Sequence, residues 1–67
     1  MSVAKITELS ATSTKSFEDA IQQGVERAHR SLRNVSGVWV KEQKLDVSNG
    51  KITDYRVLLK VTFVLED

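Results

Sequence analysis

Residues 13–34 constrain the fold most, because no other segment is long and periodic enough to give a chain of 67 residues a core. The apolar residues of this segment recur in steps of three and four, which places them on one side of a helix. They are Phe17, Ala20, Ile21, Gly24, Val25, Ala28 and Leu32. The rest of the sequence favours strands, so we expect a sheet to cover this side of the helix.

Both ends of the expected helix carry boundary signals. Ser13 can cap the first turn with its hydroxyl, and Ser16, three residues before Asp19, is the competing start. On the polar side, acidic residues gather toward the beginning and basic residues toward the end, as the helix dipole favours. Asn34 tolerates the left-handed conformation that often follows a last helical turn, so the helix is expected to end near it.

Three strands are predicted around this helix, at residues 3–11, 38–47 and 52–65. Asn49-Gly50 is the pair best suited to a two-residue type I′ turn, because both central positions need positive φ. If every neighbouring pair is antiparallel, the order strand, helix, strand, strand requires the sheet order 1-3-2. The sequence therefore predicts one α+β domain over residues 1–67, with the third strand in the centre.

The predicted second strand changes its apolar phase. Val38 and Val40 lie on one face of a regular strand, and Leu45 and Val47 lie on the other, so the alternation slips between residues 41 and 44. Two explanations remain open: a β-bulge, or a strand whose two halves bury their side chains against different partners.

The length of the third strand bears on oligomerisation. If straight, it would reach about 45 Å, whereas a compact domain of this length has a radius of gyration of about 11 Å and a diameter of about 28 Å. The hairpin must therefore curve strongly around the helix or extend to other subunits. Because cysteine is absent, no disulfide or thiolate metal site can stabilise so small a domain. We expect a symmetric oligomer.

Composition argues against several functional classes. Ten Lys and Arg against nine Asp and Glu give a net charge of +1, and the interspersed signs argue against a nucleic-acid partner. The first residues lack the features of a signal peptide and no apolar run could span a membrane, so a cytoplasmic protein is expected. Only one histidine, His29, could act as a base, and no Gly-rich phosphate loop occurs, so we expect no enzyme.

Several short motifs occur in a specific order along the chain. They are Ala11-Thr12-Ser13, Phe17-Glu18-Asp19-Ala20-Ile21 with Arg27-Ala28, Val40-Lys41-Glu42-Gln43, Tyr55-Arg56-Val57, and Lys60-Val61-Thr62-Phe63-Val64-Leu65-Glu66. In this order they resemble the dodecins, a family of small proteins that assemble twelve copies into a hollow sphere. The resemblance implies a three-stranded antiparallel sheet wrapped around one helix, and a homododecamer built from trimers.

The resemblance also implies a ligand. Flavin-binding dodecins stack the isoalloxazine ring on a Trp near the start of the second strand and hydrogen-bond its polar edge with a Gln in the third. Gly37 stands at the Trp position here, and Arg56, directly after Tyr55, stands at the Gln position. Trp39 lies two residues after Gly37, and in a regular strand the two residues would therefore point to the same face of the sheet. By this resemblance the ligand is a flavin such as riboflavin or FMN, with both principal contacts altered.

Three side chains are candidates for ligand contact, each with a plainer alternative. Trp39 offers a stacking platform or fills an intersubunit contact. Arg56 can hold a phosphate or carboxylate in a bidentate fork, or pair with Glu42, Asp54 or an acid of a neighbouring subunit. Lys44 lies where some dodecins carry a base able to meet a flavin phosphate, and otherwise it is a solvated strand lysine.

Calcium is the second ligand to consider, because some dodecins that lack the Trp and the Gln are associated with calcium or with no known ligand. The acids that could gather around such a cation are Glu42, Asp46, Asp54, Glu66 and Asp67. Their spacing matches no calcium loop, so the site would form between subunits. The sequence thus predicts a non-enzymatic shell that binds and sequesters flavin; the alternative is a shell that binds calcium or small anions, or has no flavin ligand.

Overall fold

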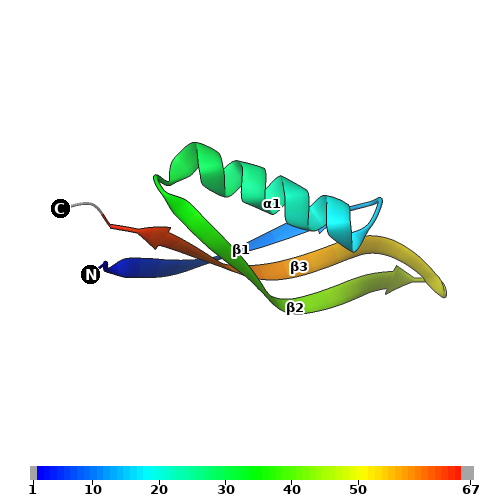
Figure 1. Cartoon of the computed structure of the whole chain (residues 1–67). Coiled ribbons are helices and arrows are strands. Elements are labelled where there is room, and N and C mark those ends of the chain that lie inside the picture. Colours follow the sequence, from blue (N-terminus) through cyan, green and yellow to red (C-terminus); the bar gives the residue numbers. More distant parts are fainter. Residues whose placement is uncertain (1, 66–67) are drawn as a thin grey trace.

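One helix lies across one face of a three-stranded sheet in the computed structural model, which describes residues 2–65 (Figure 1). Along the chain the elements are β1 (Ala4–Ser13), α1 (Phe17–Ser31), β2 (Val35–Ser48) and β3 (Lys51–Val64). The strand order is β1-β3-β2, and both pairs are antiparallel. The α+β class, the element order and the central third strand are therefore confirmed. Within the described residues, no helix is long and apolar enough to cross a membrane.

The start of α1 is fixed by two serines with different tasks. Ser16 is the N-cap: its hydroxyl accepts a hydrogen bond from the backbone N–H of Asp19 at 3.0 Å. Ser13 is instead the buried last residue of β1; its Oγ donates to Asp19 Oδ2 at 2.6 Å and accepts from the backbone N–H of Lys15 at 2.9 Å. The competing start at Ser16 is thus correct, and Ser13 joins the strand to the first helical turn.

The helix ends earlier than expected. Its last residue is Ser31, and Leu32 is already extended, although its backbone N–H still donates to Ala28 O at 2.8 Å. Asn34 does adopt the left-handed conformation, with φ of 59°, but within the connection to β2. The predicted end near Asn34 was wrong because the chain needs these residues to reverse its direction before β2 begins at Val35.

A close approach of helix and sheet gives the chain its core. The fully buried apolar side chains are Ala20, Ala28, Val57, Leu59 and Val61. Gly24 faces the same core, where a Cβ atom would lie only 2.6 Å from Leu59 Cδ1 and 3.3 Å from Leu9 Cδ1. Glycine at this position lets the helix backbone settle onto the sheet.

β-bulges explain the phase slip in β2. The register with β3 shifts between Val40 and Glu42, so Lys41 is an extra residue on β2. Because of this bulge, Val40 lies opposite Leu59 and Leu45 lies opposite Tyr55, and all four residues face the helix side of the sheet. Of the two explanations left open, the bulge is therefore the one that accounts for the slip.

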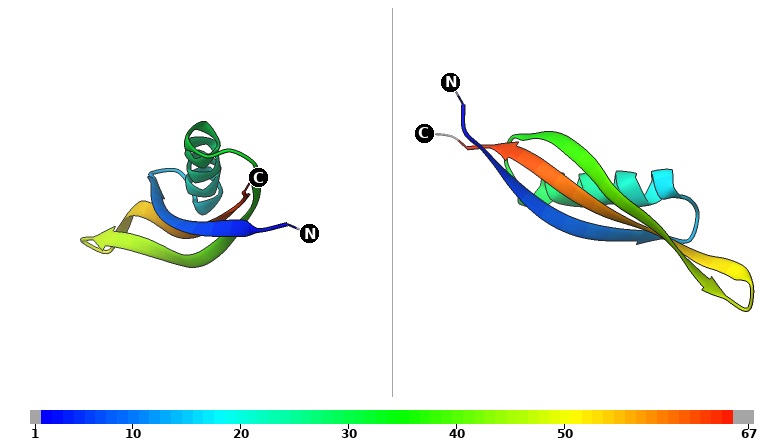
Figure 2. Two further views of the ribbon diagram at one scale, coloured as in Figure 1. Left: turned by 90° about the vertical axis from the view of Figure 1, so that its left-hand side faces the viewer. Right: turned by 90° about the horizontal axis from the view of Figure 1, so that it is seen from below.

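The β2–β3 hairpin closes as predicted and projects beyond the helix. Asn49 and Gly50 have φ of 52° and 73°, and Ser48 pairs with Lys51 across them. The hairpin continues past the start of α1 (Figure 2). As a result the chain measures 52 × 18 × 13 Å, and its radius of gyration is 13.8 Å. Extension, rather than complete wrapping around the helix, accommodates the long strands.

Candidate functional site

The sheet has a covered and an uncovered face. Along β3, Val57, Leu59 and Val61 are buried beneath α1, so the alternating residues between them point to the opposite, helix-free face. Residues directly opposite each other on neighbouring strands share a face. The pairing therefore assigns the helix-free face at each strand: Ser10 and Glu42 beside Leu58, Lys44 beside Arg56, Trp39 beside Lys60, and Gly37 beside Thr62.

The bulge at Lys41 brings the candidate ligand residues together. In a regular strand Trp39 and Lys44 would point to opposite faces, because their positions differ by five, an odd number. The extra residue reverses the alternation, so both lie on the helix-free face, together with Arg56 and Gly37. The sequence analysis did not reach this grouping, although the apolar phase slip was the signal that could have revealed it.

Trp39 presents most of its indole to solvent, since 68% of the residue is exposed. The Lys60 ammonium lies 5.7 Å from the ring centroid, at cation–π distance. Beside Trp39, a Cβ atom built on Gly37 would meet no atom within 4 Å. The helix-free face therefore offers an exposed aromatic surface with open space next to it.

Arg56 and Lys44 share one acidic partner. Arg56 Nη2 donates to Asp46 Oδ2 at 2.9 Å, and Lys44 Nζ lies 3.9 Å from Asp46 Oδ1. Neither Glu42 nor Asp54, the acids of this chain named as partners of Arg56, is the one that it contacts. The Arg56 and Asp46 side chains are 44% and 26% exposed, and pairs so open to water contribute about 0–1 kcal/mol each.

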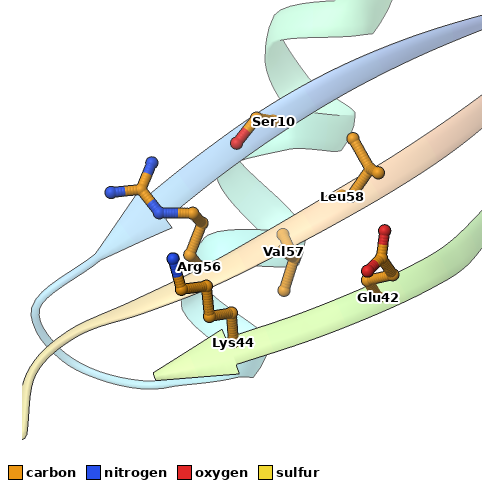
Figure 3. A pocket seen from close by; sticks show the side chains of 6 residues that line it. All are labelled: Ser10, Glu42, Lys44, Arg56, Val57 and Leu58. Atoms are coloured by element: carbon orange, nitrogen blue, oxygen red, sulfur yellow. The ribbon is translucent and has the colours of Figure 1, made fainter. Parts of the chain in front are cut away.

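A shallow pocket of about 220 Å³ lies on the helix-free face between β1 and β2 (Figure 3). Its lining residues are Ser10, Glu42, Lys44, Arg56, Val57 and Leu58. The two bases rise from neighbouring strands at one end of it, and Glu42 lies at the other (Figure 3). This volume is below the roughly 300–1,000 Å³ of typical small-molecule sites. By itself the pocket is therefore too small to enclose a typical small-molecule ligand.

The remaining candidates lie elsewhere. Among residues 2–65, no three acidic or histidine side chains are close enough to hold a metal ion; Glu66 and Asp67 lie outside the described residues. His29 is exposed on α1, where it lines a shallow cavity of about 430 Å³ on the helix flank with Val25, Glu26 and Arg30. The structure does not bring His29 near the helix-free face, because α1 covers the other side of the sheet.

Comparisons with known proteins agree with this architecture. A family model described as Dodecin matches residues 3–66. The chain is 37% identical over 65 residues to a dodecin of Thermus thermophilus, covering 97% of this chain and 94% of the relative. It is 42% identical over 64 residues to a calcium dodecin of Mycobacterium tuberculosis, covering 94% and 89%. A crystal structure of a T. thermophilus dodecin mutant superimposes with a TM-score of 0.92 and 36% identity over the whole of both chains.

Proposed function

This chain belongs to the dodecin family, and on that premise we propose that it forms a non-enzymatic cytoplasmic homododecamer, built from trimers, that binds and sequesters a flavin such as riboflavin or FMN. The observation that carries the proposal is the common helix-free face of Trp39, Lys44 and Arg56, which the bulge at Lys41 creates.

The chemistry of this face suits a planar ligand with an anionic tail. The exposed indole of Trp39 can stack on an isoalloxazine ring. It would take over the role of the stacking Trp of flavin-binding dodecins, whose position is occupied by Gly37 in this chain. Lys60, opposite Trp39, and Arg56 lie four residues apart on β3, a distance of about 13 Å along the strand. A ribityl phosphate chain attached to the ring can extend in that direction, and the guanidinium of Arg56 can hold its phosphate.

The oligomer is part of this function. The pocket of about 220 Å³ is too small and too open to enclose a flavin. A second subunit facing the helix-free surface would supply the missing wall and exclude water from the stacked ring. We therefore expect the ligand to bind between subunits.

A calcium-binding shell is the second candidate, since the relative with 42% identity is a calcium dodecin. By the family resemblance, the absence of the flavin-contacting Trp and Gln at positions 37 and 56 also favours this candidate. Because residues 2–65 hold no metal-binding cluster within one subunit, the cation would have to bind at a contact between copies, with carboxylates such as Glu42 and Asp54.

Titration of riboflavin and of FMN with the purified protein tests the proposal. We expect flavin fluorescence to be quenched as the ring stacks on Trp39, with Trp39→Phe retaining part of the quenching and Trp39→Ala losing it. Trp39 is mostly exposed, so neither change disturbs the core. Unchanged fluorescence of both flavins with the wild-type protein would overturn the flavin proposal. A melting temperature that rises with Ca²⁺ and falls with a chelator would support the second candidate.

A further inference from the structure

The two asparagines of the chain have similar backbones and different surroundings. Asn34 and Asn49 both adopt positive φ, of 59° and 52°. Both are exposed, and each lies in a connection: Asn34 directly precedes β2, and Asn49 lies at the tip of the β2–β3 hairpin. The residue that follows each asparagine and the bonds that hold it determine whether its side-chain amide can react with the neighbouring backbone.

Asn34 is held against β3. Its side-chain Nδ2 donates to Val64 O at 3.4 Å, and its backbone carbonyl accepts from the Val64 N–H at 3.1 Å. The next residue is Val35, whose branched side chain crowds its own backbone nitrogen. Bringing this nitrogen to the Asn34 side chain would therefore break the bonds to Val64.

Asn49 has neither restraint. The strand pairing ends at Ser48 and Lys51, and Asn49 and Gly50 lie beyond it. Within residues 2–65, no hydrogen bond holds the Asn49 side chain. A Cβ atom built on Gly50 would meet no atom within 4 Å, and the tip projects beyond the helix (Figure 2). Opening of an exposed, unpacked loop tip costs little free energy.

From this contrast we propose that Asn49 is a site of spontaneous deamidation and backbone isomerisation. The Gly50 backbone nitrogen gives up its proton and attacks Asn49 Cγ. The bond between Cγ and the side-chain nitrogen breaks, and that nitrogen leaves as ammonia with the proton that Gly50 released. Water then opens the resulting cyclic imide to aspartate or to isoaspartate. The reaction needs no oxidant or reductant.

The two products differ in their effect on the hairpin. Aspartate leaves the backbone unchanged, and Asp-Gly also suits a type I′ turn. In isoaspartate the main chain runs through Cβ and Cγ, so the loop gains a backbone carbon. Because loop length fixes the register of a hairpin, the longer loop disturbs the pairing of Ser48 with Lys51. Isoaspartate therefore loosens the far end of the hairpin, independently of any ligand.

Storage of the purified full chain at physiological temperature and neutral pH, followed by trypsin digestion and mass spectrometry, tests the proposal. Trypsin releases residues 34–41 and 45–51 as separate peptides, each with one asparagine and no glutamine. Amide loss raises a peptide's mass, and a sample digested without storage gives the background. We expect Asn49 to lose its amide at least about tenfold faster than Asn34, whose two bonds to Val64 must break first.

Two variants separate the chemistry from its effect on the hairpin. Asn49→Asp carries the charge of the deamidated chain without the isomerised backbone, so it should melt like the fresh wild type. Stored wild-type protein should accept methyl groups from an isoaspartyl methyltransferase and should melt at a lower temperature. Gly50→Asp keeps a residue that tolerates positive φ and places a side chain beside the attacking nitrogen, so it should slow amide loss at Asn49.

The outcomes that contradict the proposal are distinct. If the stored chain keeps the Asn49 amide while a synthetic peptide of residues 45–51 loses it, the folded turn prevents the attack and the proposal is overturned. Equal rates at Asn34 and Asn49 would overturn the contrast between the two sites. Amide loss without isoaspartate, or with an unchanged melting temperature, would overturn the effect on the hairpin.

Discussion

The near and far halves of the β2–β3 hairpin have the same alternating pattern and opposite surroundings. In the near half, Leu59 is fully buried beneath α1, and Val38 packs against the same core. In the far half, Val47 is 60% exposed although it lies on the same side of the sheet. The difference shows that the covering layer decides whether an apolar strand residue becomes core. In this chain the helix covers only half of the hairpin.

The largest difference in stability between the two halves should appear when Leu59→Ala is compared with Leu45→Ala. Leu59 is at the centre of the core, so its truncation should lower the free energy of unfolding by about 2–5 kcal/mol at every protein concentration. Leu45→Ala should lower it less than Leu59→Ala does in the unassembled chain, where Leu45 is 40% exposed, and more where the protein is assembled. Urea unfolding at two concentrations a hundredfold apart measures both. Equal, concentration-independent losses would remove the distinction between the halves.

The close helix–sheet contact in the near half is tested by Gly24→Ala. The new Cβ would lie 2.6 Å from Leu59 Cδ1, so the fully buried Leu59 side chain would have to shift. Overpacking costs about 1–3 kcal/mol, and the better helix propensity of alanine offsets about 1 kcal/mol of it.

Gly37→Ala is the matched control for that experiment, since its Cβ would meet no atom within 4 Å. We expect this change to stay within about 0.5 kcal/mol of the wild type, as surface substitutions generally do. Thermal melts of the two variants at one protein concentration give the comparison. If Gly24→Ala proved as stable as Gly37→Ala, the helix would not be held as close to the sheet as the contacts at Gly24 indicate.

The sequence was sufficient for the element types, their order and the hairpin, since periodicity and Asn49-Gly50 report on local structure. What it left open depends on pairing across strands. In the sequence, the bulge at Lys41 appears only as a slip in the apolar alternation of β2, which has two explanations. Only the register of β2 with β3 decides between them. For the same reason the partner of Arg56 was missed: Asp46 reaches it diagonally across the strands. The choice of Ser16 over Ser13 as cap followed from the burial of Ser13 at the strand end.

Acid should weaken the start of the helix through Asp19. The Ser13 hydroxyl, then the Gln23 amide and the Lys15 charge, lower the pKa of this carboxyl below its usual value. Because the pKa is lower in the folded state than in the unfolded chain, the stabilisation is present above the unfolded pKa. It is lost as the pH falls through the folded pKa. Ser13→Ala should raise the pKa of Asp19 toward its usual value and flatten the acid dependence of stability.

NMR titration of the Asp19 carboxyl in the wild type and in Ser13→Ala measures this effect. A suitable control is Ser36→Ala, because Ser36 also carries a hydroxyl but lies in β2, where it bonds Thr62 O at 3.5 Å instead of a carboxylate. It should leave the Asp19 titration unchanged. An Asp19 pKa that is the same in the wild type and in Ser13→Ala would mean that the hydroxyl does not stabilise the ionised carboxylate.

The smallest effect is expected at the polar side of the far half, from Asp46→Asn. This change removes the carboxylate that Arg56 contacts at 2.9 Å and that Lys44 approaches at 3.9 Å. Because the side chains of Asp46 and Arg56 remain 26% and 44% exposed, the loss of unfolding free energy should be below about 1 kcal/mol and should shrink further at high salt.

The same variant frees both bases, so it should strengthen FMN binding while leaving riboflavin binding nearly unchanged, which a pair of fluorescence titrations can measure. Equal changes for the two flavins would mean that Arg56 and Lys44 do not hold the phosphate. Trp39 would then remain as the proposed flavin contact on the helix-free face.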